Sequence, residues 1–153
     1  MLYQIDQNDN ELLPVIQKYG CLFLCMAQKS PTFFTGIEGV YALNYIWEKA
    51  TREGIISGDI NQDGDFDDAG EAEVQDHNAL AKLFNMSVRY DGIHHKADED
   101  IPAGIKFIIG QFYWRGSHFV CLNHRKEVEF DPLGYSNTVK NGTLKTMRFY
   151  YAV

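Results

Sequence analysis

Three residues in this chain of 153 supply the functional groups that nucleophilic catalysis requires: Cys21, His118 and Asp131. A thiolate can attack a carbonyl carbon, an imidazole can transfer the proton, and a carboxylate can hold the imidazole in one tautomer. The three residues lie far apart in the sequence, so the elements around them decide whether their side chains meet.

The segment around Cys21 predicts a helix start. Gly20 precedes the apolar run CLFLCMA, so the thiol falls in the first turn of the expected helix. There the helix dipole and a neighbouring imidazolium favour the thiolate form. Cys25 lies one turn later and is the competing nucleophile. The alternative interpretation is that both cysteines are small core residues.

His118 and Asp131 belong to a predicted hairpin with strands at 117–123 and 126–131. A tight turn between these strands makes His118 the direct cross-strand partner of Asp131 and puts Cys121 on the core face. Opposed residues have Cβ atoms about 5 Å apart, close enough for a hydrogen bond. A surface ion pair without a function is the alternative.

The order of periodic segments predicts the fold class. Helical patterns occur at 11–28, 38–53 and 71–84, and period-two patterns follow at 86–90, 105–114, 118–123, 126–130 and 144–153. Helices followed by strands indicate an α+β domain, with the N-terminal helices packed on a C-terminal antiparallel sheet. The sequence contains no repeat and no linker, so we expect a single domain spanning 1–153.

Short motifs in this order resemble the papain-like cysteine peptidases. YGC stands at a helix start, GSHFV on a later strand, and FDP at the end of the next strand. The resemblance is to the compact bacteriocin-processing branch and to an uncharacterised bacterial family related to this fold. It covers residues 15–30 and 105–135. It implies that Cys21 is the nucleophile, that His118 is the general base and acid, and that Asp131 orients His118.

The chain departs from this family at the oxyanion hole. Members place a Gln about six residues before the Cys, whereas here Val15 holds that position and Gln17 lies four residues before the thiol. The resemblance therefore implies either that Gln17 contributes to the oxyanion hole or that the hole is incomplete.

The expected activity is that of a thiol hydrolase on a peptide or isopeptide bond, with a peptide or protein as substrate. Two alternatives remain: a catalytically weak or inactive binding module on the same scaffold, and a thiol acyltransferase that uses the same triad. Asn123 and Glu129 are weaker candidates for the orienting residue. His94 and His95 are expected to be a solvated pair in a loop, and zinc binding by Cys21, Cys25 and a His is a weak alternative.

A second motif lies in the acidic segment 59–71, an insertion in the predicted domain. Its pattern D-x-N-x-D-G-x-x-D resembles the calcium loops of EF-hand, dockerin and integrin-propeller proteins. Gly70 occupies the twelfth position, where a bidentate acid is expected, so Glu71 would close a variant loop. A solvated acidic loop is the alternative. The expected oxygen ligands are Asp59, Asn61, Asp63, Asp65 through its backbone, Asp67 and Glu71.

Charge and composition exclude some partners. The net charge is −7, and the segment 59–76 holds eight acids and no Lys or Arg. Such a chain is poorly suited to bind nucleic acid or an anionic membrane surface. No stretch approaches the roughly 20 apolar residues of a membrane span. The N-terminus lacks a signal pattern, and three cysteines indicate reduced thiols, so we expect a cytoplasmic protein.

Overall fold

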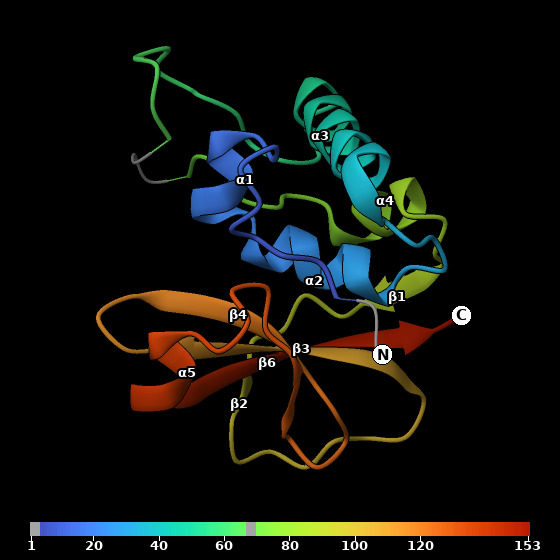
Figure 1. Ribbon diagram of the computed structural model, residues 1–153. Helices are drawn as coiled ribbons and strands as arrows, with labels where there is room; N and C mark the ends of the chain where they lie inside the picture. The colour runs from blue at the N-terminus through green and yellow to red at the C-terminus, as the bar shows by residue number, and fades with distance from the viewer. Residues whose placement is uncertain (1–3, 67–69) are drawn as a thin grey trace.

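A computed structural model describes residues 4–66 and 70–153, and Figure 1 shows their arrangement. Its elements confirm the α+β class that the order of patterns predicts. In chain order they are α1 (Pro14–Tyr19), α2 (Cys21–Lys29), α3 (Gly36–Arg52), α4 (His77–Leu83), β1 (Val88–Tyr90), β2 (His95–Lys96), β3 (Ile105–Tyr113), β4 (Ser117–Leu122), β5 (Val128–Phe130), α5 (Asn137–Asn141) and β6 (Thr143–Ala152).

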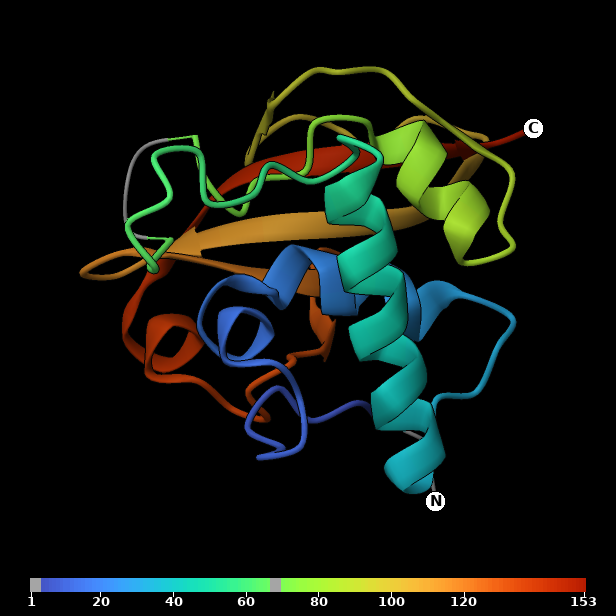
Figure 2. The same ribbon diagram turned by 90° about the horizontal axis from the view of Figure 1, so that it is seen from above.

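The strands form one six-stranded sheet in the order β1-β6-β3-β4-β5, with β2 also paired to β6. Every pairing between these strands is antiparallel. The helices α1 to α4 lie on one side of the sheet, and α2 lies directly against it with α3 farther away (Figures 1 and 2). The helix that begins with Cys21 is thus the layer next to β4.

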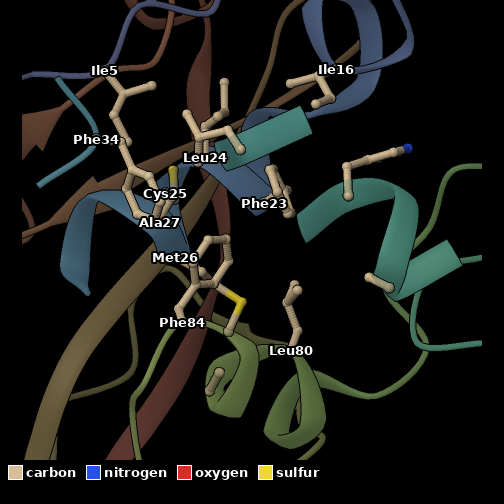
Figure 3. Packing of buried hydrophobic residues seen from close by; sticks show 14 of the residues in the cluster. Ile5, Ile16, Phe23, Leu24, Cys25, Met26, Ala27, Phe34, Leu80 and Phe84 are labelled. Atoms are coloured by element: carbon tan, nitrogen blue, oxygen red, sulfur yellow. The ribbon is translucent and has the colours of Figure 1, made fainter. Parts of the chain in front are cut away.

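The main core fills the space between the helices and the sheet, and α2 runs through it. Phe23 packs edge-on against Trp47 and also contacts Phe84, with ring centroids 5.1 Å apart in both pairs. Figure 3 shows α2 side chains gathered with those of α4 and neighbouring segments. A smaller cluster buries the opposite face of the sheet. Its members are Ile105, Ile108, Val120, Leu122, Met147 and Phe149.

The third predicted helix begins later than its apolar pattern indicates. α4 starts at His77, because the Asp76 side chain accepts a hydrogen bond from Ala79 N at 3.0 Å and so caps the helix there. Val74, expected in the helix, instead pairs with Ile56 in an isolated antiparallel bridge. The sequence patterns also did not indicate the short elements β2 and α5.

The predicted register of the β4–β5 hairpin is wrong. Phe130 pairs with Cys121 and Val128 with Leu122, across an irregularity in the ladder. The turn holds one more residue than expected, since Asn123 N donates to Glu127 O at 2.9 Å. The turn is accommodated by Lys126, whose φ of 64° lies in the left-handed region. Cys121 is fully buried in the helix-side core, which confirms its predicted face.

In the part of the chain that the structure describes, no helix has both the length and the apolar character needed to cross a bilayer.

Candidate active site

Cys21 is the first residue of α2, as the sequence predicts, because α1 and α2 meet directly at Gly20. Gly20 N donates to Ile16 O at 2.8 Å, and Leu24 N donates to Gly20 O at 2.8 Å. A Cβ atom at Gly20 would lie 2.6 Å from Ile16 O. Glycine therefore permits the close junction that puts the thiol at the helix start.

The other two cysteines lie between α2 and β4, where each sulfur contacts a backbone oxygen of the other element. Cys25 Sγ lies 3.5 Å from Phe119 O, and Cys121 Sγ lies 3.5 Å from Cys25 O. Both side chains are fully buried, and burial raises the pKa of the Cys25 thiol well above its ordinary value. Cys25 is therefore a protonated core thiol, whereas Cys21 is 9% exposed. The geometry favours Cys21 as the nucleophile.

His118 and Asp131 meet as expected, although the register that predicts their contact is wrong. His118 Nε2 lies 2.6 Å from Asp131 Oδ1, and both residues are buried. Beyond Phe130 the chain turns back, with Gly134 N donating to Asp131 O at 2.8 Å. This turn, rather than direct cross-strand pairing, brings the carboxylate to the imidazole.

The Asp131 carboxylate is held by the backbone of the turn. Oδ1 also accepts from Leu133 N at 2.9 Å, and Oδ2 accepts from Ser136 N at 2.9 Å. Ser136 in turn caps α5 by accepting from Val139 N at 3.3 Å. Burial opposes ionisation, but these bonds and the one to His118 lower the pKa of Asp131 below its ordinary value. The residue is therefore a fixed carboxylate.

His118 connects the carboxylate to the thiol. Nε2 faces Asp131, and Cys21 is the other side chain that interacts with the imidazole. Burial alone would lower the pKa of His118, but Asp131 and Cys21 outweigh it and raise the pKa to about 9. The imidazole is therefore a cation at neutral pH.

A cleft of about 610 Å³ contains Cys21. Its wall combines apolar side chains with basic and acidic ones from both layers of the fold. The lining residues are Lys18, Tyr19, Cys21, Leu22, Phe23, Trp47, Phe66, Glu71, Ala72, Glu73, Val74, His77, His94, Gln111, Ser117, Phe119 and Arg148. This volume is of the size that small-molecule and peptide side-chain sites occupy.

Sequence reasoning missed the basic residues of this cleft. Arg148, His77 and His94 all line it. One signal was present: Arg148 interrupts the apolar end of the last strand, MRFYY, and a charged residue there must have a partner or a function.

Gln17 lies close to the thiol in sequence but has another contact. Its Nε2 donates to Leu12 O at 2.7 Å, and Gln17 is not among the cleft-lining residues. A different glutamine, Gln7, is buried beside it and donates from Nε2 to Ile16 O and Gln17 O, both at 3.0 Å. Because α2 has no side-chain cap, the backbone N–H groups of its first turn are the available oxyanion donors.

The weaker candidates for the orienting role have other partners. Asn123 Oδ1 accepts from two backbone amides of its own turn, and Glu129 forms an ion pair with Lys29. Asp131 is thus the candidate that contacts His118.

His94 is exposed, as expected of a solvated histidine, whereas His95 is half-buried. His95 stacks on Phe149 and has a carboxylate oxygen 2.7 Å from each ring nitrogen, from Asp91 and Glu99. His94 Nε2 lies 3.1 Å from an Arg148 nitrogen. Among residues 4–66 and 70–153, neither histidine belongs to a cluster that could hold a metal. Such a cluster lies in the acidic segment and consists of acids.

That group consists of Asp59, Asp63 and Glu71, each offering an oxygen within 4.8 Å of the others. The loop is curled by its own side chains, since Asp59 Oδ2 accepts from Gly64 N at 2.8 Å. Glu71 is buried and Oε2 accepts from Ile60 N at 2.6 Å, so it closes the loop from its far end. Asp59, Asp63 and Glu71 are three of the residues that the spacing predicts as oxygen ligands.

The remaining predicted ligands, Asn61, Asp65 and Asp67, are not part of this group of three carboxylates. Asn61 Oδ1 accepts from Asp63 N at 3.3 Å, and Asp65 N donates to Asp63 Oδ1 at 3.1 Å. Asp67 lies outside the described residues. The donor set is made of oxygens, which suits a hard cation of the size of Ca²⁺.

Comparisons with protein-family models, with curated proteins and with solved structures found no match to this chain.

Proposed function

We propose that this protein is a papain-like thiol hydrolase that cleaves a peptide or isopeptide bond with Cys21, His118 and Asp131. One observation carries the proposal: His118 contacts a buried carboxylate and interacts with Cys21, whose thiol lines a cleft. The helix-start cysteine and the Nε2 contact to Asp131 support the papain-like assignment.

In the proposed reaction the Cys21 thiolate attacks the substrate carbonyl carbon. Backbone N–H groups of the first turn of α2 stabilise the oxyanion. The His118 imidazolium gives its Nδ1 proton to the leaving amine, and a thioester remains. Water then attacks the thioester and loses a proton to His118, which releases the acid and the thiolate. Asp131 keeps the imidazole oriented throughout.

Hydrolysis of a fluorogenic peptide-amide library tests the proposal directly. We expect turnover by the native protein, and loss of turnover by at least about 10³-fold in Cys21→Ala and His118→Ala. Cys121→Ser is the matched control, because it changes a core thiol outside the cleft. Equal turnover in Cys21→Ala and the native protein would exclude the proposed nucleophile.

A thiol acyltransferase would use the same residues and differ in the acceptor. Adding an amine such as glycinamide to the assay separates the two activities. A hydrolase forms the free acid, whereas a transferase forms the amide in preference to the acid.

A weak or inactive binding module is favoured by the contact of Gln17 with Leu12, which takes a side-chain donor away from the thiol. This alternative predicts ligand binding in the cleft with no acyl-enzyme after single-turnover mass spectrometry. Accumulation of a thioester on Cys21 would exclude it.

We also propose that the segment 59–71 binds calcium as a structural ion. Asp59, Asp63 and Glu71 supply converging carboxylates, and Asn61, Asp65 and Asp67 complete the expected set of oxygen ligands. The ion would offset the repulsion within this acidic segment. It is separate from the thiol chemistry, and calorimetric titration with Ca²⁺ tests it.

The proposed setting is a reducing compartment, with the cytoplasm as the simplest one. The three cysteines are free thiols, and a thiolate nucleophile is preserved where disulfides do not form. The proposed partner is a peptide or protein substrate, with no role for nucleic acid or a membrane surface because of the negative net charge.

A further inference from the structure

The cleft that contains Cys21 is also lined by a buried cation, Arg148 on β6. This residue is 6% exposed. Nη1 donates to Thr146 Oγ1 at 3.1 Å, Nη2 lies 3.1 Å from His94 Nε2, and the guanidinium lies 4.7 Å from the centroid of the Phe119 ring. Neutral groups therefore hold Arg148 in one orientation at the cleft wall.

Arg148 has no carboxylate partner within residues 4–66 and 70–153. Burial lowers the pKa of Arg148, and the titratable groups that raise it are the phenols of Tyr90 and Tyr150. A buried cation without an anion is costly, because its hydration is lost and no opposite charge replaces it. An anionic ligand would remove that cost.

The other titratable groups around Arg148 are neutral near pH 7. Burial, with Arg148 and His94, lowers the pKa of His77 to about 4, although Asp76 acts in the opposite direction. Burial and Arg148 also lower the pKa of His94. Burial raises the pKa of Tyr90; Asp91 adds to this rise, and Arg148 opposes it. Burial also raises the pKa of Tyr150. Arg148 is thus the positive charge of this part of the cleft.

The guanidinium retains donors for a ligand. Arginine has five N–H groups in a planar fork, and the bonds to Thr146, His94 and Tyr90 use only some of them. A carboxylate matches this fork through two parallel hydrogen bonds. The acids Glu71 and Glu73 also line the cleft, so a singly charged carboxylate fits better than a phosphate.

We propose that Arg148 binds a carboxylate of the substrate, and that the cleft therefore selects peptides with a free carboxylate near the bond that Cys21 attacks. Leu22, Phe119 and Val74 line the same cleft and would contact an apolar side chain of that peptide. This inference rests on the proposed function for its reaction, but the binding site itself does not require a reactive thiol.

The first experiment compares alkylation of Cys21 by bromoacetyl-phenylalanine and by its amide. The two reagents differ in the carboxylate alone. We expect the acid to react at least about tenfold faster with the native protein, the ratio that a charge-assisted hydrogen bond gives. A second pair, bromoacetyl-glutamate 1-amide and bromoacetyl-glutaminamide, distinguishes a side-chain carboxylate from a C-terminal one.

Variants assign the preference to a residue. Arg148→Gln should bring the acid-to-amide ratio to within about twofold of one. Lys18→Gln is the matched control, because Lys18 is another cation of the cleft wall. Retention of the preference in Arg148→Gln, or its loss in Lys18→Gln, would overturn the proposal, since His118 or Lys18 would then be the source of the attraction.

A binding experiment keeps the proposal testable if Arg148→Gln does not fold or if Cys21 is unreactive. In the Cys21→Ser protein, calorimetry should show that N-acetyl-phenylalanine binds at least about tenfold more tightly than its amide. Equal affinity for acid and amide would overturn the carboxylate site. If no reagent alkylates Cys21 while the acid still binds selectively, the proposed hydrolase fails and the carboxylate site stands.

Discussion

His118 and Asp131 are joined by a 2.6 Å contact between Nε2 and Oδ1, although they are not cross-strand partners. The partner of Phe130 on β4 is Cys121, and Asp131 reaches the imidazole from the turn that follows β5. The carboxylate is thus positioned by three hydrogen bonds of its own, to His118, Leu133 and Ser136. Its role can therefore be tested without changing the sheet.

Replacing Asp131 should lower the reactivity of Cys21. Asp131→Asn removes the charge that stabilises the His118 cation, so we expect the rate of iodoacetamide labelling at pH 7 to fall at least about tenfold. Glu127→Gln changes an exposed acid of the same hairpin and serves as the control. An unchanged labelling rate in Asp131→Asn would mean that the carboxylate does not act on the thiol.

Limiting iodoacetamide should modify Cys21 before the other two cysteines. Cys25 and Cys121 are fully buried, so the reagent reaches neither sulfur in the folded protein, and burial also raises the pKa of Cys25. Peptide mapping by mass spectrometry after partial labelling measures the distribution. If most of the label were on Cys25 or Cys121 in the folded protein, the assignment of the nucleophile would be wrong.

The ion pair between His118 and Asp131 should make folding stability depend on pH above neutrality. The folded pKa of about 9 lies above the ordinary value of 6.5, so the stabilisation is complete below pH 6.5 and is lost as the pH rises to 9. Denaturant melts between pH 6 and 10 should show a decline in the native protein that is reduced in His118→Gln. Parallel curves for the two proteins would contradict a shifted His118.

Calcium should raise the melting temperature, since it binds the folded acidic segment better than the unfolded chain. Asp63→Ala should abolish this increase and leave the labelling of Cys21 unchanged, while Asp98→Ala, an exposed acid outside the segment, should retain it. A melting temperature that does not respond to calcium or chelator would identify 59–71 as a solvated acidic loop.

Gly20→Ala should destabilise the fold by about 1–3 kcal/mol. The added Cβ would lie 2.6 Å from Ile16 O, a backbone atom, and 2.7 Å from its Cγ2 atom, so the junction of α1 and α2 would have to open. Because Cys21 follows this junction, we expect slower thiol labelling as well. Urea melts measure the first effect, and a change below 0.5 kcal/mol would show that the junction adapts easily.

The sequence by itself determined the elements that carry the triad. The Gly20 position and the apolar run predict α2 with Cys21 at its start, and period-two patterns predict the strands that carry His118 and lead to Asp131. These are local properties, because helix and strand periodicity depend on neighbouring residues. The acidic spacing likewise predicts the cluster of Asp59, Asp63 and Glu71.

Only the tertiary structure decided which side chains meet across the fold. The hairpin register depends on one extra turn residue, Lys126, and the alternation of apolar and polar residues in the strands does not reveal it. The start of α4 depends on the capping hydrogen bond of Asp76. Arg148 lies on a distant strand and becomes a cleft residue when β6 pairs beside β3. Contacts of this kind join residues far apart in the chain, so no local sequence pattern encodes them. They are set by the packing of the helices against the sheet.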